Sequence, residues 1–494
     1  MNYKPVLKDE RIRIAFLFQI ASFWPAWESF YLTCKTDARF DVRFYYVNDG
    51  VYDSNQTKSA ETFLIENNFE YIKFSYENFN NFNPHVAVVQ TPYEYYHRKP
   101  HLYAAKLKNE GIRVVYIPYG IEIADTPAAR HDHFREPVIR NAWRVYTLSD
   151  DFAVEYKKYC DNYLAVRALG LPRFDMLINS RRHTLSRQIF EETKKRKIIV
   201  WHTHFAKKID TADGKRQVTP YVDEYIQFAA KISQYADKMF FIFLPHPLFG
   251  DDAVDMENNR KSDELLKILS QTENVFIDKA DDYRPSLMNC DAIITDRSAL
   301  MVESAVTGVP ILYIKNPDYD EPLFPPLTAL VDSYYQGNGC DDILNFVEMV
   351  QNGKDERKEQ RNKLFNKCVP HFDGKCGERI KEDIINSINA AYINSSEIKI
   401  VIFGTGFMYN KIMSFFKFPA YCKVIALSDN NKDKWGQHID GVKVFAPNEI
   451  INLNFDKIII MVANVFEEQV YHQLSYELEI PKSKIEFCEY IGGI

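Results

Sequence analysis

The sequence predicts an α/β protein made of three consecutive units, each built around a mostly parallel sheet. Short apolar segments alternate along the chain with longer segments of mixed polarity, which is the pattern of strands joined by helices. Several of the apolar segments end in histidines or in a polar turn, where open α/β sheets bind ligands. At 494 residues the chain also exceeds what one hydrophobic core usually spans, so we expect two or three domains.

The first unit is predicted to be a Rossmann-like domain over residues 1–176. We expect five strands in it, at Ile12–Phe18, Val42–Val47, His85–Gln90, Arg113–Ile117 and Val145–Leu148. Segments of helical length, such as Tyr103–Asn109, separate them. Aromatic side chains follow two of the strands, at Phe23–Trp27 and Tyr93–Tyr96. These rings suit stacking on sugars, and core packing is an equally good interpretation of the first group.

A second Rossmann-like unit is predicted over residues 195–393. Its expected strands are Ile198–His202, Met239–Leu244, Asn274–Ile277, Ala292–Thr295 and Ile311–Ile314. The stretch Glu378–Tyr392 has the apolar spacing of a helix that closes the unit. Because the second unit repeats the pattern of the first, each should carry its own parallel sheet.

Histidines stand at two strand ends of the second unit. One strand ends in His202, with His204 two residues later, and another runs into His246 between two prolines. The carboxyl ends of parallel strands lie along one edge of a sheet, so we expect these imidazoles to collect in one place. A capping or core role is the alternative for His246.

A third strand end is the polar turn Asp296, Arg297 and Ser298, where the chain leaves a strand to open a helix. Backbone N–H groups and the helix dipole attract anions there, a serine hydroxyl can donate, and an arginine can pair with two phosphate oxygens. Glu303 follows one to two helical turns later, within reach of ribose hydroxyls. We predict a nucleotide diphosphate pocket; an ordinary strand-helix-strand unit with polar ends is the alternative.

The third unit, residues 398–494, is predicted to be a small Rossmann-like domain with a GxG turn. A strand runs into Gly404 and Gly406, and Asp429 ends the next strand. Glycines let a backbone approach a phosphate, and a following acid can hold ribose. Tyr409 occupies the position of the third glycine, which favours a regulatory, assembly or vestigial domain over a working cofactor site.

Composition narrows the function classes. The formal net charge of −7 gives no general attraction to nucleic acid, and no apolar run approaches the ~20 residues that cross a bilayer. The first residues are charged where a signal peptide needs an apolar core. The eight cysteines are scattered without a CxxC pair. We expect a cytoplasmic protein with free thiols that does not bind nucleic acid.

Two further motifs complete an ordered set. Gly170–Asp175 (GLPRFD) joins the first two units, and Asp373–Ile380 (DGKCGERI) closes the second. Together with the histidine between two prolines and the segment TDRSALMVES, the chain resembles the CDP-glycerol glycerophosphotransferase family of teichoic-acid and capsule polymerases over roughly residues 113–380. The resemblance implies a GT-B fold, in which an acceptor-side and a donor-side Rossmann-like domain face each other. The third unit would be an addition to that architecture.

The resemblance also implies roles for individual residues. His246 and Ser298 would contact the donor diphosphate, and Arg379 would belong to the donor side on the returning helix. Arg173 and Asp175 would brace the crossing between the domains, most simply as an ion pair.

The catalytic base is where this chain departs from the family. The family's Trp-His-Gly histidine corresponds to Tyr119 in the loop after the strand Arg113–Ile117. A phenol with a pKa near 10 is a poor base at neutral pH. Glu122 and Asp125 in the same loop could each supply a base instead. Glu122 is our predicted base, with Tyr119 shaping the acceptor pocket. His202 and His204 are further candidates.

The predicted activity is transfer from a nucleotide-activated donor to a hydroxyl of a bacterial surface polysaccharide. A CDP-linked polyol phosphate is the favoured donor, and a UDP-linked donor or a sugar transfer is the alternative. No metal or cofactor is expected, because Arg297, His246 and the N–H groups at Ser298 would neutralise the leaving phosphate. The acceptor would be a glycan or a lipid-linked glycan, with peripheral association at the cytoplasmic face of the inner membrane. A nucleotide-sugar 2-epimerase and a non-catalytic glycan-binding subunit are the rival interpretations.

Overall fold

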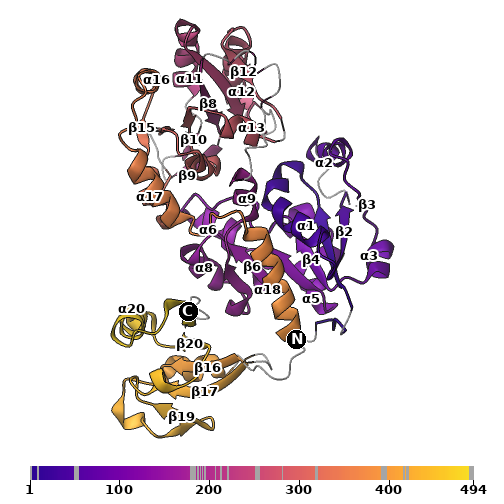
Figure 1. Cartoon of the computed structure of the whole chain (residues 1–494), viewed down its shortest axis with the longest axis vertical. Helices are drawn as coiled ribbons and strands as arrows, with labels where there is room; N and C mark the ends of the chain where they lie inside the picture. Colours follow the sequence, from indigo (N-terminus) through magenta and orange to yellow (C-terminus); the bar gives the residue numbers. More distant parts are fainter. Residues whose placement is uncertain are drawn as a thin grey trace.

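The computed structural model contains three α/β units, each built around its own sheet (Figure 1). It describes residues 3–7, 10–48, 55–178, 196–205, 207–211, 214–219, 222–250, 256–280, 282–316, 321–390, 398–414 and 422–488, with the single residues 185, 189, 191, 193 and 418. The predicted α/β class, with three consecutive units, is confirmed.

The first unit is a seven-stranded parallel sheet in the order β3-β2-β1-β4-β5-β6-β7. Its strands are β1 (Ile12–Phe18), β2 (Phe40–Tyr46), β3 (Ile72–Lys73), β4 (Val86–Val89), β5 (Arg113–Tyr116), β6 (Arg144–Thr147) and β7 (Val166–Ala168). Helices that connect or follow them include α1 (Glu28–Lys35), α2 (Asn55–Glu66), α3 (Tyr76–Phe82), α5 (Ala104–Asn109), α6 (Pro127–Phe134), α8 (Asp150–Lys157) and α9 (Pro172–Ile178). The central strands are buried apolar runs, as expected for a sheet covered on both faces.

The second unit has six parallel strands in the order β12-β11-β8-β13-β14-β15. They are β8 (Lys197–Thr203), β11 (Met239–Pro245), β12 (Val275–Ile277), β13 (Ala292–Thr295), β14 (Ile311–Ile314) and β15 (Tyr335–Gly337). The hairpin β9 (Lys207–Thr211) and β10 (Gly214–Thr219) follows β8. The main helices are α11 (Val222–Ala229), α12 (Met256–Ser270), α13 (Arg284–Met288), α14 (Leu300–Glu303), α15 (Pro325–Asp332), α16 (Cys340–Gln351) and α17 (Lys358–Cys368).

After the second sheet, helix α18 (Cys376–Ala390) returns to the first unit and lies against α1 and α9 (Figure 1). Its start is capped by Asp175, whose carboxylate accepts hydrogen bonds from the N–H groups of Cys376 at 2.9 Å and Gly377 at 2.8 Å. A Cβ on Gly377 would lie 2.5 Å from the carbonyl carbon of Ser29, so only glycine allows this close approach. Further along, Asp383 accepts from Arg144 Nε at 3.0 Å. The returning helix is thus part of the first unit's packing.

The third unit has a six-stranded sheet in the order β18-β19-β17-β16-β20-β21, parallel except for the β18–β19 pair. The strands are β16 (Ile398–Phe403), β17 (Cys422–Ser428), β18 (His438–Ile439), β19 (Val442–Phe445), β20 (Lys457–Ile460) and β21 (Ile485–Phe487), with helices α19 (Phe407–Met413) and α20 (Asn464–His472). Tyr163 and Leu164 of the first unit belong to its hydrophobic core. The third unit is therefore packed on the first.

Strands β3, β7 and β15 have two or three residues each and were not predicted, because so few residues show little periodicity. The equally short β12 lies within the predicted strand Asn274–Ile277. All eight cysteines are free, as predicted. Among the described helices, none has the length and hydropathy needed to span a membrane.

Candidate active site

The carboxyl edges of the first and second sheets meet. Ala124, which follows β5, forms an antiparallel bridge with Leu323, which follows β14. Arg284 Nη1 donates to Glu28 Oε2, and the two residues follow β12 and β1. Open α/β sheets bind ligands outside the carboxyl ends of strands where the strand order reverses, which is between β8 and β13 in the second sheet. The predicted residues stand at this point.

Asp296 joins the ends of β8 and β13. Its Oδ1 accepts from the N–H of His204 at 2.8 Å, and its Oδ2 accepts from Thr203 Oγ1 at 2.8 Å and Tyr225 Oη at 3.1 Å. Burial raises the pKa of Asp296 to about 6. Because its oxygens already accept three hydrogen bonds, Asp296 fixes the two strand ends and is not turned toward a donor as predicted.

Two of the three predicted histidines come into contact here, and the third, His202, lies near enough to His246 to contribute to lowering its pKa. The rings of His204 and His246 lie 4.8 Å apart, and Phe205 contacts both. The sequence prediction of one imidazole cluster is supported by this geometry. We call His202, His204, His246, Asp296 and Ser298 the second-sheet edge.

The hydrogen bonds of His246 and His202 decide which ring nitrogen carries the proton. Burial lowers the pKa of both rings, to about 4 for His202, so both are neutral at pH 7. His246 Nδ1 accepts from the N–H of Leu248 at 3.1 Å, which leaves the proton on Nε2 and makes that atom a donor. His202 Nδ1 lies 2.8 Å from the carbonyl oxygen of Leu244 and must donate. Its Nε2 is therefore a buried acceptor without a hydrogen-bond partner among the described residues.

Ser298 presents an unused hydroxyl. The residue is 8% exposed, and its Oγ has no hydrogen-bond partner in the part of the chain that the structure describes. A buried polar atom without a partner costs about 1–3 kcal/mol, which a ligand can recover. Ser298 Oγ and His246 Nε2 are thus two neutral donors suited to a phosphate.

Arg297 is placed differently from its prediction. Its Nη2 donates to the carbonyl oxygen of Pro322 at 2.6 Å, and its Nε lies 3.4 Å from Glu321 Oε2. The N–H of Asp125 donates to the same Pro322 carbonyl at 2.8 Å. The guanidinium therefore holds the loop that bridges the two units, and in this arrangement it does not face a diphosphate.

Glu303 is also engaged. Its Oε1 lies 3.2 Å from Arg173 Nε, and its Oε2 accepts from Tyr283 Oη. Arg173 comes from the first unit, so this is a buried ion pair across the two units. The predicted contact of Glu303 with ribose would require the carboxylate to leave these partners.

Arg379 and Asp175 act at the crossing between the units. Arg379 binds both oxygens of Asp373 at 2.7 Å and donates to the carbonyl oxygens of Leu169 and His371, each at 3.1 Å. These bonds brace the crossing and leave Arg379 turned away from the second-sheet edge, contrary to its prediction as a donor-binding residue. The predicted bracing by Arg173 and Asp175 is found, but with Glu303 and the start of α18 as their partners.

On the first unit, Tyr119 stands after β5 within an aromatic group. Its ring stacks on Phe23 with centroids 4.0 Å apart, and its Oη lies 3.1 Å from Tyr93 Oη. Burial raises the pKa of both phenols, so neither is ionised near neutral pH. We call Phe23, Tyr93 and Tyr119 the first-sheet edge; its flat rings suit a sugar or polyol surface.

Glu122, the predicted base, is 3% exposed, and its Oε1 accepts from Tyr156 Oη. Burial raises the pKa of this carboxyl to about 7. That value suits a base, but the carboxylate is enclosed and directed at α8. In this geometry Glu122 anchors the loop that carries Tyr119.

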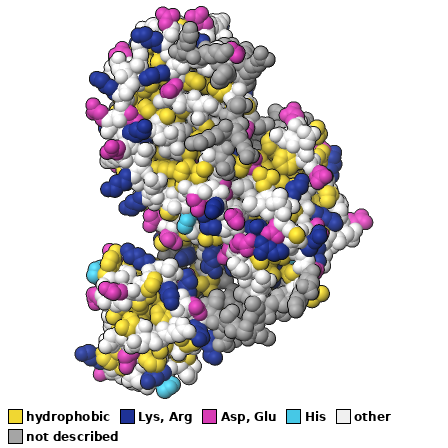
Figure 2. All heavy atoms as spheres, in the orientation of Figure 1, with side chains coloured by type: hydrophobic (Ala, Val, Ile, Leu, Met, Phe, Trp, Pro, Cys, Tyr) yellow, Lys and Arg dark blue, Asp and Glu magenta, His cyan; other side chains and the backbone are white. Residues whose placement is uncertain are grey.

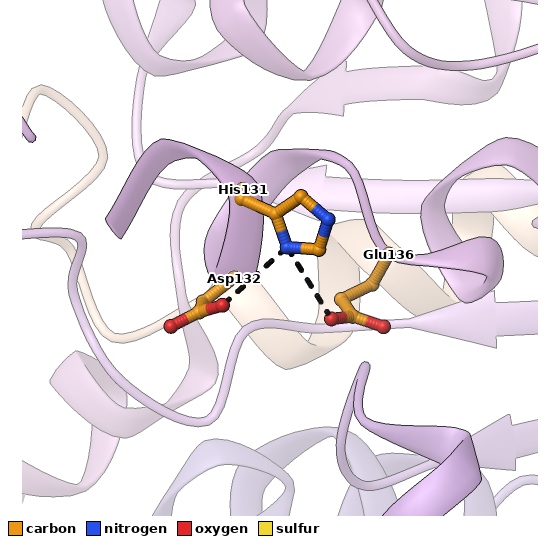
Figure 3. Close-up of side chains that lie close together, drawn as sticks. All are labelled: His131, Asp132 and Glu136. Atoms are coloured by element: carbon orange, nitrogen blue, oxygen red, sulfur yellow. Dashed lines mark ion pairs between the residues drawn. The ribbon is translucent and has the colours of Figure 1, made fainter. Parts of the chain in front are cut away.

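A group of side chains not singled out from the sequence lies on and just after α6. His131 Nδ1 is 3.5 Å from Asp132 Oδ1 and 4.0 Å from Glu136 Oε1 (Figure 3). His131 and Asp132 are exposed, whereas Glu136 is buried. The signal in the sequence is the run His131-Asp132 with Glu136 five residues after His131, directly after a strand-end loop.

The glycine turn of the third unit is closed by its own side chains. Asp429 Oδ2 accepts from the Thr405 N–H and the Lys434 Nζ, each at 2.9 Å. Gly404 has φ of 102°, and a Cβ there would lie 2.5 Å from the Met461 carbonyl oxygen. A Cβ on Gly406 would meet no atom within 4 Å. The carboxylate of Asp429, which was predicted to hold ribose, binds Thr405 and Lys434 instead.

On the face shown in Figure 2, lysine and arginine side chains are interspersed with aspartate and glutamate. That face shows no single basic stripe of the kind that follows a nucleic-acid backbone.

Comparison with known protein families finds matches for two segments of the chain. Residues 152–386 match the sequence model of CDP-glycerol:poly(glycerophosphate) glycerophosphotransferase. The chain contains a glycerophosphotransferase-family domain. The matched segment includes the whole second-sheet edge and the crossing at Arg173 and Arg379. Residues 396–486 match a second model, described as C2185-like, N-terminal. A search of curated protein sequences finds no match.

Solved structures give the fold around the glycerophosphotransferase domain. A putative UDP-N-acetylglucosamine 2-epimerase from Listeria monocytogenes aligns with a TM-score of 0.55 at 12% identity, over 78% of this chain and 98% of that chain. The Neisseria meningitidis UDP-GlcNAc 2-epimerase bound to UDP-GlcNAc aligns at 0.52 and 13%, over 76% and 100%. A variant of the wall teichoic acid polymerase TagF soaked with CDPG aligns at 0.51 and 13%, over 79% and 91%. The predicted GT-B architecture is confirmed.

Proposed function

We propose that the protein transfers a glycerol-phosphate-type group from a CDP-linked donor to a hydroxyl of a bacterial surface polysaccharide. The observation that carries this proposal is the glycerophosphotransferase match over residues 152–386, which spans every residue of the second-sheet edge. The TagF variant soaked with CDPG and the epimerase bound to UDP-GlcNAc both share the fold, so the preference for a CDP-linked donor rests on the family match alone.

The second-sheet edge is the proposed donor site. His246 Nε2–H and Ser298 Oγ–H would donate to the diphosphate, and His202 Nε2 would accept from a donor hydroxyl. Neutral donors in a buried site stabilise developing negative charge without reorganising in the reaction. In this proposal His246 and Ser298 bind the anion, whereas Asp296 and Arg297 position the loops around it.

The first-sheet edge is the proposed acceptor site. The stacked Tyr119 and Phe23 rings and the Tyr93 hydroxyl offer apolar area with a polar rim, which suits a glycan or a lipid-linked glycan. A cytoplasmic location, peripheral to the inner membrane, goes with such a substrate pair. Eight free thiols support a reducing compartment.

The test is product analysis with purified protein, CDP-glycerol and a polysaccharide acceptor extract. We expect CMP release that depends on the acceptor, and we expect mass spectrometry to show a phosphodiester in the product. UDP release from a UDP-linked sugar with a glycosidic product would assign glycosyl transfer instead. Acceptor-independent conversion of a UDP-sugar would assign epimerisation, and no turnover with nucleotide or glycan binding alone would assign a scaffold.

A further inference from the structure

Transfer to a hydroxyl requires a group that removes the hydroxyl proton, and the first-sheet edge does not supply one. The phenols of Tyr93 and Tyr119 are paired with each other, and burial raises the pKa of both. Glu122 is enclosed and bonded to Tyr156. A base that meets an acceptor must instead be exposed, and it must lie beside this edge.

We propose that His131 is the general base of the transfer, with Asp132 and Glu136 as its positioning residues. This inference rests on the proposed function. Both carboxylates approach Nδ1, at 3.5 Å from Asp132 and 4.0 Å from Glu136, so they favour a proton on that nitrogen (Figure 3). Nε2 then carries the lone pair, and it takes part in no hydrogen bond recorded within the described chain. An imidazole oriented by a carboxylate on one nitrogen is a common general base on the other.

The position of His131 matches this role. Helix α6 follows the loop after β5 that carries Tyr119, and Thr126 caps it by accepting from the Ala129 N–H at 3.1 Å. Arg130 binds Glu155 at 2.7 Å, which fixes the helix on α8. The same loop forms the Ala124–Leu323 bridge to the second unit. Helix α6, which carries His131, thus begins where the two sheet edges meet.

Asp132 connects the base to the first-sheet edge. Its carboxylate acts on the phenols of Tyr93 and Tyr119, where it adds to the effect of burial in raising their pKa values. Burial raises the pKa of Glu136, and the nearby carboxylates of Asp132 and Glu94 raise it further, while His131 lowers it. An acceptor lying on the rings of Tyr119 and Phe23 would therefore place its hydroxyls beside the α6 cluster, which consists of His131, Asp132 and Glu136.

The transfer of the group from the donor to the acceptor hydroxyl needs no further reactant. His131 Nε2 takes the proton of the acceptor hydroxyl as that oxygen forms a bond to the β-phosphorus of the donor. The bond between the β-phosphorus and the bridging oxygen breaks, and CMP leaves with the electron pair. The imidazolium then releases its proton to water, which restores the base.

The test compares acceptor-dependent CMP release by His131→Ala, His131→Gln and wild-type protein. General-base loss should lower kcat by about 100-fold or more and leave the Kd for CDP and the acceptor KM near wild type. Added imidazole should restore part of the His131→Ala activity, which loss of a structural contact would not allow. His133→Ala, two residues along the same helix, is the matched control and should keep wild-type turnover.

Several outcomes would overturn the assignment. Wild-type turnover in His131→Ala would remove it, as would a loss that appears as a raised acceptor KM and is not rescued by imidazole. Loss in Glu122→Gln with full activity in both His131 variants would return the role to Glu122. If wild-type protein releases no CMP, the proposed function itself fails, so the two failures are distinct.

Discussion

Arg173 Nε lies 3.2 Å from Glu303 Oε1, and this buried ion pair joins the first unit to the second. The same guanidinium donates through Nη1 to the carbonyl oxygen of Tyr119 at 3.0 Å. One side chain thus links the loop of the first-sheet edge to helix α14 behind the second-sheet edge. Arg173 therefore couples the position of the proposed acceptor site to that of the proposed donor site.

This pair should be strongly coupled in stability. Removing one partner leaves a buried charge unpaired, so Arg173→Met and Glu303→Gln should each lower the free energy of unfolding by roughly 3–5 kcal/mol. The double variant should lose much less than the sum, as measured by urea unfolding. Arg39 and Glu382 form an exposed pair at 2.5 Å and serve as the control, with coupling below about 1 kcal/mol. Additive losses for Arg173 and Glu303 would show that the pair does not join the units energetically.

Glu122 should make stability depend on pH. Burial raises its folded pKa to about 7 from 4.5, so the folded state holds a proton that the unfolded state has already lost between these values. The contribution of Glu122 to stability is therefore present below pH 4.5 and is lost as the pH rises through 7. Glu122→Gln keeps an acceptor for Tyr156 and should gain up to about 3 kcal/mol relative to wild type between pH 5 and pH 8. If the difference in free energy of unfolding between Glu122→Gln and wild type were the same at pH 5 and pH 8, the carboxyl of Glu122 would not be buried as the structure places it.

Ser298 should separate binding from stability. Its hydroxyl is buried without a partner among the described residues, so Ser298→Ala should leave the unfolding temperature unchanged or raise it slightly. The same change should weaken CDP binding roughly 10-fold, because a hydrogen bond to a charged group contributes about 1.5–3 kcal/mol. Ser304 also has a buried Oγ without such a partner, and Ser304→Ala should match the stability effect with no change in affinity by calorimetry. Equal affinities for all three proteins would exclude Ser298 from the donor site.

The two glycines of the third unit should respond differently to alanine. Gly404 has φ of 102° and meets the Met461 carbonyl oxygen, whereas Gly406 has φ of −91° and open space around it. Gly404→Ala should destabilise the third unit by more than about 2 kcal/mol, and Gly406→Ala should be nearly neutral in thermal unfolding. The reverse order would indicate that the turn is held by something other than its backbone geometry.

The strands of the fold were predictable because buried parallel strands appear as short apolar runs. Ile12–Phe18, Ala292–Thr295 and Ile311–Ile314 were predicted at the bounds the structure gives. Strand-end placement also predicted the approach of His204 to His246, since adjacent parallel strands end at one edge.

Side-chain partners could not be predicted in the same way. Arg173 and Glu303 are distant in sequence, and nothing local shows that each satisfies the other's buried charge. Arg297 has the residue type of a phosphate ligand, yet its Nη2 donates to the nearby Pro322 carbonyl oxygen and its guanidinium forms an ion pair with Glu321. The α6 cluster was missed because helical spacing brings His131 and Glu136 together only once the helix and its exit are placed.

The most direct test of the account is the structure of the protein bound to CDP-glycerol. We predict the diphosphate beside Ser298 Oγ and His246 Nε2, with the transferred group directed toward Tyr119 and His131. A nucleotide seated instead at the Gly404 turn of the third unit, with Ser298 Oγ still unbonded, would contradict the central claim.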